Sequence, residues 1–327
     1  MKQSCITIIG AGQIGSRHLQ ALCHLESLSR IDLVDPSDES LQTAKIRYEE
    51  IASSVNQAIE IHYHNNLDAL PDSLDLVIIA TNSLVREEVL RDVIRKRLVK
   101  NLILEKVLFQ KIDQYMKVEG LLNESSIPTW VSCWMRTTDL YKKIKSLLDY
   151  GEEIQMKVEG PQWGIGCNSI HFLDLFSFLT LTEDFKFTKI ELENKVLESK
   201  RTGFKEFFGR LAGQSSHGHS LELICHKTGE EATMVKILNG SKSFQVSGLL
   251  GNVIFKTSIK NEICMEETSL PYQSQLTHIW ANDILEKGLC DLPTYTTSMP
   301  LHLELVSVLI SHFRKITGKE IDTCPIT

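Results

Sequence analysis

A glycine-rich turn begins ten residues into the chain and separates a short apolar run from a helical pattern. The run at residues 6–9 is rich in β-branched residues. Gly10, Gly12 and Gly15 follow at the spacing Gly-x-Gly-x-x-Gly. In this motif the first glycine permits a tight turn, the second lets the backbone approach a diphosphate, and the third allows close helix–strand packing. The motif predicts that the chain opens with a strand, turn and helix that bind a dinucleotide.

A carboxylate stands twenty residues beyond Gly15. Asp35 ends the second β-rich run, residues 31–34, where an acidic side chain accepts hydrogen bonds from the adenosine ribose hydroxyls. Its charge would repel a 2′-phosphate, so we expect NAD in preference to NADP. The alternative is a turn that only joins strand and helix, with Asp35 as an ordinary turn residue before Pro36.

The first third of the sequence alternates strand and helix patterns, which predicts a doubly wound parallel sheet with right-handed crossovers. Residues 76–80 are uninterruptedly apolar, as in a parallel strand buried on both faces. Thr81 and Asn82 follow, where such a sheet opens its ligand crevice; the alternative is a capping pair for the next helix. Strands are expected at 6–9, 31–34, 61–63, 76–80 and 102–104, with a helix at 85–98.

The pattern changes around residues 125–128. We therefore expect a dinucleotide-binding α/β (Rossmann) domain at 1–125 and an α+β domain with an open-faced, mainly antiparallel sheet at 126–327. The C-terminal helices are candidates for packing back onto the first domain. In this part strands are expected at 130–134, 154–158, 221–224, 234–237, 244–246 and 253–255, and helices at 139–148, 172–181, 275–285 and 301–313.

Composition narrows the function classes. Lysine and arginine total 35 and aspartate and glutamate 42, a net charge of −7 that argues against an extended nucleic-acid footprint. The apolar runs are too short for a signal peptide or a membrane span. The eight cysteines are scattered without a Cys-x-x-Cys pair, which indicates reduced thiols. We expect a cytoplasmic protein that binds neither nucleic acid nor membrane.

Three segments carry a family resemblance: residues 15–18 (Gly-Ser-Arg-His), residues 76–81 and residues 104–106 (Leu-Glu-Lys). With them the sequence resembles the glucose–fructose oxidoreductase / inositol dehydrogenase / rhizopine catabolism (Gfo/Idh/MocA) oxidoreductases. The resemblance covers essentially the whole chain and is strongest up to Lys106 and over residues 134–181. It implies a Rossmann domain joined to an open-faced sheet, a homodimer or dimer of dimers, and NAD(P)-dependent chemistry on sugars and polyols.

The family's Glu-Lys-Pro motif falls on Glu105 and Lys106, with Val107 at the proline position. The resemblance implies that Lys106 approaches both nicotinamide and substrate. From the sequence alone Lys106 ends a buried strand at the crevice edge, and the alternative is a solvated strand-end lysine. Because Val107 is not proline, we expect a trans peptide bond before it.

The family's second motif places an aspartate four residues before a histidine, and it falls on Cys167 and His171, with Asp174 following. On a helix these three residues share a face. The resemblance implies that His171 takes the substrate hydroxyl proton. Cys167 replaces the aspartate, and a neutral thiol does not supply that carboxylate. Cys167 and Asp174 are candidates for proton relay or substrate contact; the alternative for His171 is a structural histidine.

Arg136 and Tyr141 match the family's Arg-x-x-Pro-x-Tyr neighbourhood, with Asp139 at the proline position. They are candidate substrate or interdomain residues, and the alternative is the start of a surface helix.

Two histidine pairs are candidate metal ligands, His62 with His64 and His217 with His219. No carboxylate or cysteine joins either pair at ligand spacing, so we interpret them as solvated histidines and expect no metal site.

The sequence therefore predicts an oxidoreductase that transfers a hydride between a nicotinamide coenzyme and a secondary alcohol or ketone of a sugar, sugar derivative or polyol. Lys106 and His171 are the candidate catalytic residues. The alternative is a non-catalytic dinucleotide-binding sensor or scaffold, favoured by the replacements at Val107 and Cys167. The expected coenzyme contacts are Gly10, Ala11, Gly12, Gln13, Ile14, Gly15, Asp35, Thr81, Asn82, Glu105 and Lys106.

Overall fold

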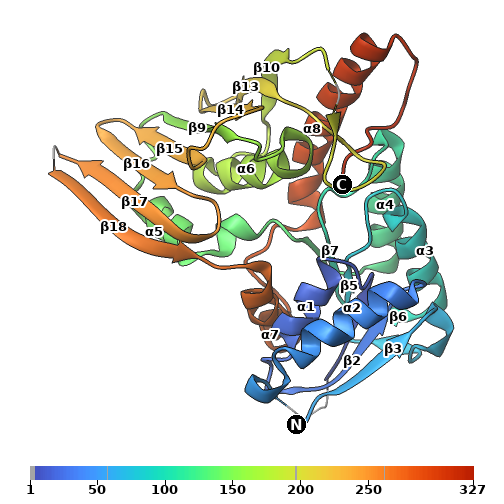
Figure 1. The fold of residues 1–327 in the computed structure, drawn as a ribbon. Helices are drawn as coiled ribbons and strands as arrows, with labels where there is room; N and C mark the ends of the chain where they lie inside the picture. The colour runs from blue at the N-terminus through green and yellow to red at the C-terminus, as the bar shows by residue number, and fades with distance from the viewer. Residues whose placement is uncertain (1–3, 57, 196, 261) are drawn as a thin grey trace. The chain divides into compact units, whose positions relative to one another are not determined.

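The computed structural model describes residues 4–56, 58–195, 197–260 and 262–327. Two compact units make up the chain (Figure 1). The N-terminal unit comprises the chain up to Phe109 together with Asp113–Ser132 and Tyr272–Tyr295. The C-terminal unit comprises Gln110–Ile112, Cys133–Pro271 and the chain from Thr296 onward.

The N-terminal unit holds a six-stranded sheet in the order β3-β2-β1-β5-β7-β8, and every neighbouring pair is parallel. From β1 the strand order runs to one edge through β2 and β3, and to the other through β5, β7 and β8. Right-handed crossovers therefore place the helices of the two halves on opposite faces. The strands are β1 (Ser4–Ile9), β2 (Leu28–Val34), β3 (Glu60–His64), β5 (Leu76–Ile79), β7 (Leu102–Leu104) and β8 (Thr129–Val131).

Helices lie between these strands, as the alternating pattern predicts. They are α1 (Gly15–Leu22), α2 (Asp38–Glu49), α3 (Arg86–Lys96) and α4 (Ile112–Ser125), and α7 (Thr277–Lys287) joins the same unit from late in the sequence. All four residues of β5 are completely buried, as its apolar run predicts.

The end of α3 differs from the prediction. The helix expected to reach Leu98 ends at Lys96, and Leu98 is 66% exposed in a short strand, β6 (Leu98–Val99), that pairs with β4 (Ser73–Leu74). Leu98 continues the apolar helical pattern of the preceding residues, but the backbone turns before it so that β6 can pair with β4.

The C-terminal unit holds an eight-stranded sheet in the order β10-β13-β14-β9-β15-β16-β17-β18. The sheet is antiparallel except between β9 and β14, which run parallel, so the predicted mainly antiparallel sheet is confirmed. Its strands are β9 (Ile154–Pro161), β10 (Lys186–Leu192), β13 (Gly209–Gln214), β14 (Ser220–His226), β15 (Met234–Asn239), β16 (Lys242–Ser247), β17 (Gly251–Ile259) and β18 (Glu262–Leu270), and a separate pair is formed by β11 (Leu197–Glu198) and β12 (Lys205–Glu206).

Buried and more exposed side chains alternate along the strands, which shows that one face of this sheet is covered. In β9, Ile154, Met156 and Val158 are buried while Lys157 and Glu159 on the other face are not. The helices of this unit are α5 (Asp139–Leu147), α6 (Ile165–Thr180) and α8 (Tyr295–Thr317), and α6 packs against β9 and β14.

The strand expected at residues 130–134 is shorter than predicted. Strand β8 ends at Val131, and Trp134 begins a 3₁₀ turn, η3 (Trp134–Thr137). The division between units falls inside the expected strand, after Ser132, so Trp130 and Trp134 belong to different units.

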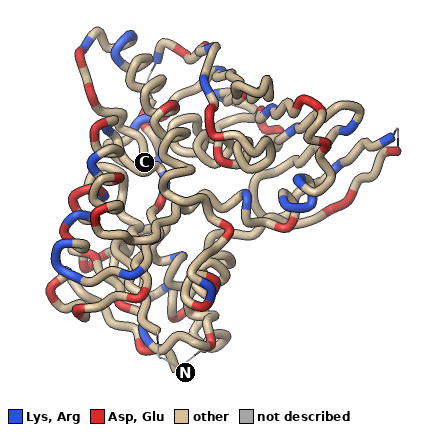
Figure 2. The backbone as a smooth tube through the Cα atoms, turned by 180° about the vertical axis from the view of Figure 1, so that it is seen from behind, with Lys and Arg blue, Asp and Glu red and all other residues tan. Residues whose placement is uncertain are grey.

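Charged residues of both signs occur throughout the described chain. Figure 2 shows lysine and arginine interspersed with aspartate and glutamate along the backbone.

All eight cysteines lie in the described part of the chain, and none of them forms a disulfide bond. Among the described residues, the helices lack the combined length and apolar character that crossing a bilayer requires.

Candidate active site

The three glycines of the N-terminal turn serve different purposes. A Cβ atom on Gly10, whose φ is +101°, would lie 2.8 Å from Ala80 C and from Thr81 N, and one on Gly15 would lie 1.7 Å from the Gly10 carbonyl oxygen. These two positions exclude side chains so that the turn, α1 and the end of β5 can meet. At Gly12, by contrast, a Cβ would have no described atom within 4 Å, and the residue is exposed. The protein's own packing therefore does not require the bare backbone at Gly12.

The backbone around Gly12 offers hydrogen-bond donors. Its carbonyl accepts bonds from the amide of Ser16, at 3.0 Å, and from the Ser16 hydroxyl, at 2.8 Å, which closes the first turn of α1. Among the described residues, the amides of Gln13 and Ile14 donate to no acceptor of the protein. Free N–H groups at the positive end of a helix dipole suit an anion. The turn thus fits a diphosphate.

Asp35 contacts this turn directly. Its Oδ2 accepts a bond from the Ala11 amide at 2.7 Å, and its Oδ1 accepts one from the Ser37 amide at 2.9 Å. Each carboxylate oxygen can accept a further bond. The carboxylate is therefore beside the turn, as its spacing predicted, and has lone pairs available for a ribose hydroxyl.

Thr81 and Asn82 follow β5 next to the glycine turn, since the Thr81 amide nitrogen lies against Gly10. The Asn82 side chain accepts a bond from the Leu84 amide at 3.0 Å and so forms a turn before α3. Helix α3 itself starts at Arg86 with Val85 at the N-cap position. Asn82 shapes the loop ahead of the helix and does not cap it.

Glu105, which follows β7, lies in a buried polar network. Its Oε1 is 3.1 Å from His18 Nε2 and 3.4 Å from Gln273 Nε2, and His18 Nδ1 is 2.8 Å from Thr277 Oγ1. Burial by itself would raise the pKa of Glu105, but the hydrogen bond and charge of His18 and the hydroxyl of Ser132 hold it at about 2. Glu105 is an ionised anchor that ties the end of β7 to His18 on α1 and to Gln273 before α7, and these partners were not predicted from the sequence.

Lys106 is half-buried directly after this anchor. The peptide bond between Lys106 and Val107 is cis, so the expected trans bond is wrong. The local sequence did not reveal the tertiary contacts of this segment. Arg86, which is 1% exposed on α3, donates to the carbonyl groups of Val107, Leu108 and Thr81. The course of the chain after Lys106 is thus determined by a helix that begins twenty residues earlier.

In the C-terminal unit, Arg136 and Asp174 form a buried ion pair. Arg136 Nε donates to Asp174 Oδ2 at 2.8 Å, and Arg136 Nη2 lies 2.8 Å from Oδ1. The Asp174 side chain on α6 is completely buried, and the guanidinium also lies 5.4 Å from the ring centre of Phe178. Burial raises the pKa of Asp174 to about 6, while Arg136 acts to lower it. Two residues predicted separately are thus direct partners.

His171 lies on α6 between Cys167 and Asp174, as predicted. It is 7% exposed, and its ring meets the ring of Trp134 edge-on with 6.1 Å between centres. Tyr141 on α5 is completely buried, and burial raises its pKa. The alternative of a surface helix is therefore wrong for Tyr141.

An unpredicted carboxylate lies beside Cys167. Glu206 accepts bonds from the amides of Gly166, at the start of α6, and of Phe207, at 3.0 Å. A Cβ on Gly164 would lie 2.7 Å from Glu206 Oε2 and 2.9 Å from Cys167 Sγ, so the carboxylate and the thiol meet over this glycine. Burial raises the pKa of Glu206, opposed by the bonds from Phe207, Gly166 and Cys167. A strand distant in sequence thus supplies a carboxylate next to the position where the family has aspartate.

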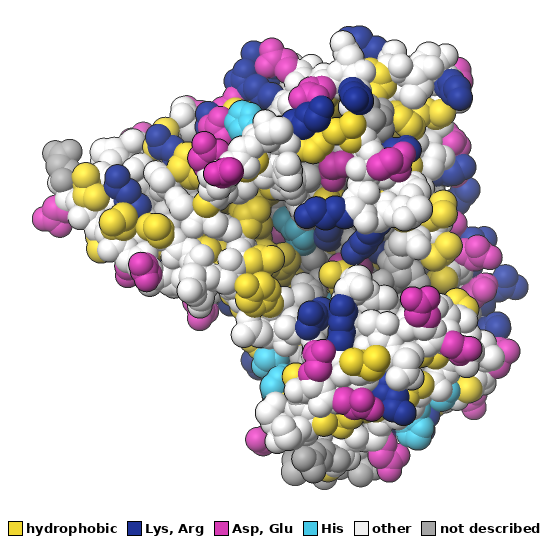
Figure 3. Space-filling model, viewed as in Figure 1, with side chains coloured by type: hydrophobic (Ala, Val, Ile, Leu, Met, Phe, Trp, Pro, Cys, Tyr) yellow, Lys and Arg dark blue, Asp and Glu magenta, His cyan; other side chains and the backbone are white. Residues whose placement is uncertain are grey.

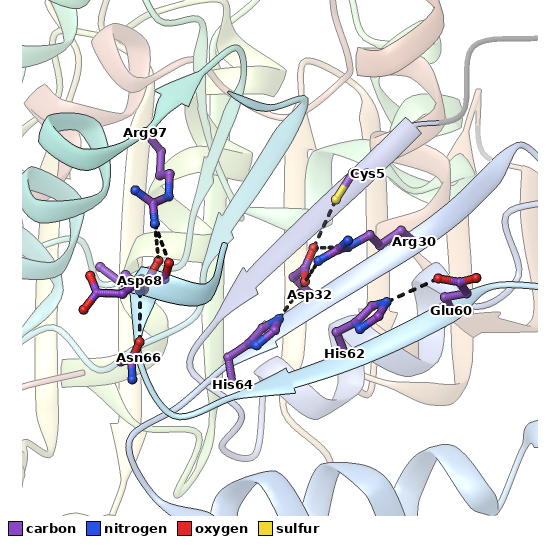
Figure 4. A network of polar contacts seen from close by, with 10 residues as sticks. Cys5, Arg30, Asp32, Glu60, His62, His64, Asn66, Asp68 and Arg97 are labelled. Carbon is purple, nitrogen blue, oxygen red and sulfur yellow. Dashed lines mark hydrogen bonds and ion pairs between the residues drawn. The ribbon is translucent and has the colours of Figure 1, made fainter. Parts of the chain in front are cut away.

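The first histidine pair is part of a structural network (Figure 4). The rings of His62 and His64 on β3 stack with 6.2 Å between centres. His64 Nε2 lies 2.7 Å from an oxygen of the fully buried Asp32, which also accepts bonds from Arg30 and from the Cys5 thiol. His64 is therefore not solvated, because Asp32 on the neighbouring strand faces it.

The two histidines of the second pair, His217 and His219, lie in different environments. His219 Nδ1 accepts a bond from the Ile154 amide at 3.1 Å, and His217 is exposed beside Ser216. In the described part of the chain no group of three or more histidines, cysteines and carboxylates is arranged to hold a metal ion.

Residues 5–132 match the sequence model of the Gfo/Idh/MocA proteins, described as an oxidoreductase family with an NAD-binding Rossmann fold. No curated protein matches the chain by sequence.

Solved structures resemble nearly the whole chain. An oxidoreductase from Agrobacterium radiobacter, in complex with NAD+, L-tartaric acid and magnesium, has a TM-score of 0.72 at 15% identity, with 98% of each chain covered. UDP-N-acetylglucosamine 3-dehydrogenase from Acidithiobacillus ferrooxidans has a TM-score of 0.67 at 14% identity and covers 94% of this chain and 97% of its own. The transcriptional regulator Gal80p from Kluyveromyces lactis has a TM-score of 0.68 at 14% identity and covers 98% and 94%. At these identities the likeness is one of fold.

Proposed function

We propose that this chain, which belongs to the Gfo/Idh/MocA oxidoreductase family, is an NAD-dependent dehydrogenase or reductase acting on a secondary alcohol or ketone of a sugar, sugar derivative or polyol. The observation that carries the proposal is the open backbone at Gly12, flanked by free amides and by the Asp35 carboxylate. Asp35 supports NAD over NADP, because a carboxylate in that place binds ribose hydroxyls and repels a 2′-phosphate.

The residues that would hold the coenzyme are those of the turn. The amides of Gln13 and Ile14 would bind the diphosphate, and Asp35 the adenosine ribose. Thr81 and Asn82 would line the crevice beside the turn, and the ionised Glu105 would hold Lys106 at the end of β7. The bound coenzyme would supply the hydride acceptor or donor.

Proton transfer would fall to His171 and Lys106. His171 would remove the substrate hydroxyl proton during oxidation and return it during reduction, and Lys106 would orient that hydroxyl or assist the transfer. The Asp174–Arg136 pair and the Cys167–Glu206 contact flank His171 on α6 and would fix the helix that presents it. The similarity in fold to UDP-N-acetylglucosamine 3-dehydrogenase supports the proposal of a sugar-like substrate.

A second candidate is a non-catalytic dinucleotide sensor. It is favoured by Cys167 at the family's aspartate position and by the likeness to the regulator Gal80p. Fold alone does not guarantee activity.

We further propose that the chain forms a homodimer or dimer of dimers through the open face of its sheet. Ile254, Ile263 and Met265 lie on one face of β17 and β18 and are 46%, 67% and 69% exposed. Figure 3 shows apolar side chains at the surface around these strands.

Cysteines without disulfides support a reducing compartment such as the cytoplasm.

The test has two stages. Titration calorimetry with NADH and NADPH measures binding, and we expect tighter binding of NADH. A panel of sugars and polyols with NAD+ is then followed through the absorbance of the reduced nicotinamide. Lys106→Met and His171→Gln should lose turnover while still binding NADH, and the exposed His217→Gln is the matched control. No heat with either coenzyme would contradict the proposal, and NADH binding without turnover on any substrate would favour the sensor.

A further inference from the structure

Arg47, near the end of α2, reaches back to the glycine turn. Its Nη1 donates to the Gln13 carbonyl at 3.1 Å and to the Ser16 hydroxyl at 2.5 Å, and its Nη2 donates to the Gln13 side-chain oxygen. One guanidinium therefore holds both the backbone and the side chain of Gln13. Arginine suits this arrangement because its donors form a rigid planar fork.

These bonds continue into the turn and into α1. The Ser16 hydroxyl that receives Arg47 donates to the Gly12 carbonyl at 2.8 Å. The Arg47 carbonyl accepts a bond from Gln20 Nε2 at 2.7 Å, and Gln20 Oε1 accepts one from Arg17, also at 2.7 Å. Arg47 therefore contacts α1 through both its guanidinium and its main-chain carbonyl. Through Ser16 it also fixes the peptide between Gly12 and Gln13.

The two arginines also concentrate positive charge beside the turn. Within the described residues, Arg47 and Arg17 donate to the neutral groups of Gln13, Ser16 and Gln20. Burial lowers the pKa of Arg47, and the nearby charge of Arg17 lowers it further, whereas Glu50 acts to raise it. Cations that the protein does not neutralise favour an anion in their vicinity.

We propose that Arg47 is a coenzyme-positioning residue that fixes the Gly12–Gln13 peptide and, with Arg17, supplies positive charge toward the diphosphate. The proposal rests on the function proposed above. Asp35 holds the turn at Ala11, on the ribose side, and Arg47 holds it at Gln13. We assign Arg47 to the diphosphate, which NADH and NADPH share, and not to a 2′-phosphate, which only NADPH carries.

The test compares three variants by titration calorimetry with NADH and with NADPH over a series of salt concentrations. Arg47→Gln should weaken both coenzymes by a similar factor, of the order of tenfold, as expected for losing charge-assisted bonds at a half-exposed site. It should also reduce the dependence of affinity on salt, which a purely structural residue would not do. Arg47→Lys should retain the salt dependence but not the full affinity. Lys45→Gln, an exposed neighbour on the same helix, is the control for losing one positive charge.

Gln13→Ala gives a second measurement that leaves α2 intact, because it removes one acceptor of Arg47 from an exposed side chain. A several-fold loss of affinity for both coenzymes is expected. Unchanged affinity in Arg47→Gln and Gln13→Ala, with normal binding by the wild type, would overturn the assignment of Arg47 and leave the proposed function standing. A loss confined to NADPH would overturn it in favour of a 2′-phosphate contact. No binding by the wild type would overturn the proposed function itself.

Discussion

The imidazole of His18 lies 3.1 Å from the carboxylate of Glu105, and both side chains are buried in the N-terminal unit. The pKa of this carboxyl is held at about 2, below its ordinary value of 4.5, despite the opposing effect of burial. A carboxyl whose pKa is lower in the folded than in the unfolded state stabilises the fold above its unfolded pKa. That stability is lost as pH falls from 4.5 toward 2, because the unfolded chain takes up the proton first.

We therefore expect Glu105→Gln to cost stability at neutral pH and progressively less on acidification. The pKa difference corresponds to a change of the order of 3 kcal/mol. Urea unfolding of the wild type and of Glu105→Gln at a series of pH values measures it, and subtraction removes the pH dependence that they share. A constant difference between the two proteins across this range would contradict the assignment.

In the glycine turn, Gly15 is required for packing, whereas Gly12 is proposed to be required for coenzyme binding. Gly12→Ala should change the free energy of unfolding by less than about 1 kcal/mol, because the new methyl group would have no described atom within 4 Å. It should nevertheless weaken NADH binding at least about tenfold by blocking the approach of the diphosphate. Gly15→Ala should instead destabilise the fold by more than about 3 kcal/mol, because its Cβ would lie 1.7 Å from the Gly10 carbonyl oxygen. Urea unfolding and calorimetry distinguish the two, and similar stability losses in both variants would contradict this division.

The sequence predicted the parts of this molecule that local pattern determines. Residues 76–79 form a buried strand because their apolar run is short and continuous. Gly10, Gly15 and Asp35 lie together because the strand–turn–helix motif fixes their spacing. Strand β18 was missed because nearly all of its residues are exposed, so no apolar alternation marks it.

The partners of the candidate site residues could not be predicted in the same way. His18 meets Thr277 across 259 residues of sequence, and Glu206 meets Gly166 across 40. Such contacts depend on tertiary packing and leave no periodicity in the chain. His18 was visible only as part of the family resemblance, and no sequence pattern indicated Glu206.

The Arg136–Asp174 pair should respond to pH in the opposite sense to Glu105. Burial raises the pKa of Asp174 from 3.8 to about 6, so ionisation of this carboxyl costs stability as pH rises through that interval. Arg136→Met should add to this cost by leaving a buried charge without its partner, by about 3 kcal/mol at slightly alkaline pH. Below pH 3.8 Asp174 is neutral and the cost of the substitution should shrink.

Unfolding experiments on Arg136→Met in the wild-type and Asp174→Asn backgrounds test this assignment. The pH-dependent part of the cost should disappear when Asp174 is replaced, because the remaining side chain does not ionise. If the cost of Arg136→Met keeps the same pH dependence in both backgrounds, another group is responsible.

The last prediction concerns Cys167 and Glu206. Two carboxylates placed together at the start of α6 would lower the stability of the fold. Glu206 already accepts the amide of Gly166 and lies against the Cys167 thiol. Restoring the family's aspartate by Cys167→Asp places a carboxylate at a half-buried position beside Glu206, and we expect a loss of about 2 kcal/mol at neutral pH. Cys167→Asn, of similar shape but neutral, should lose less, and Glu206→Gln combined with Cys167→Asp should recover stability. Urea unfolding of these variants measures the coupling. If Cys167→Asp and Cys167→Asn prove equally stable at neutral pH, Glu206 does not occupy the place of the missing carboxylate.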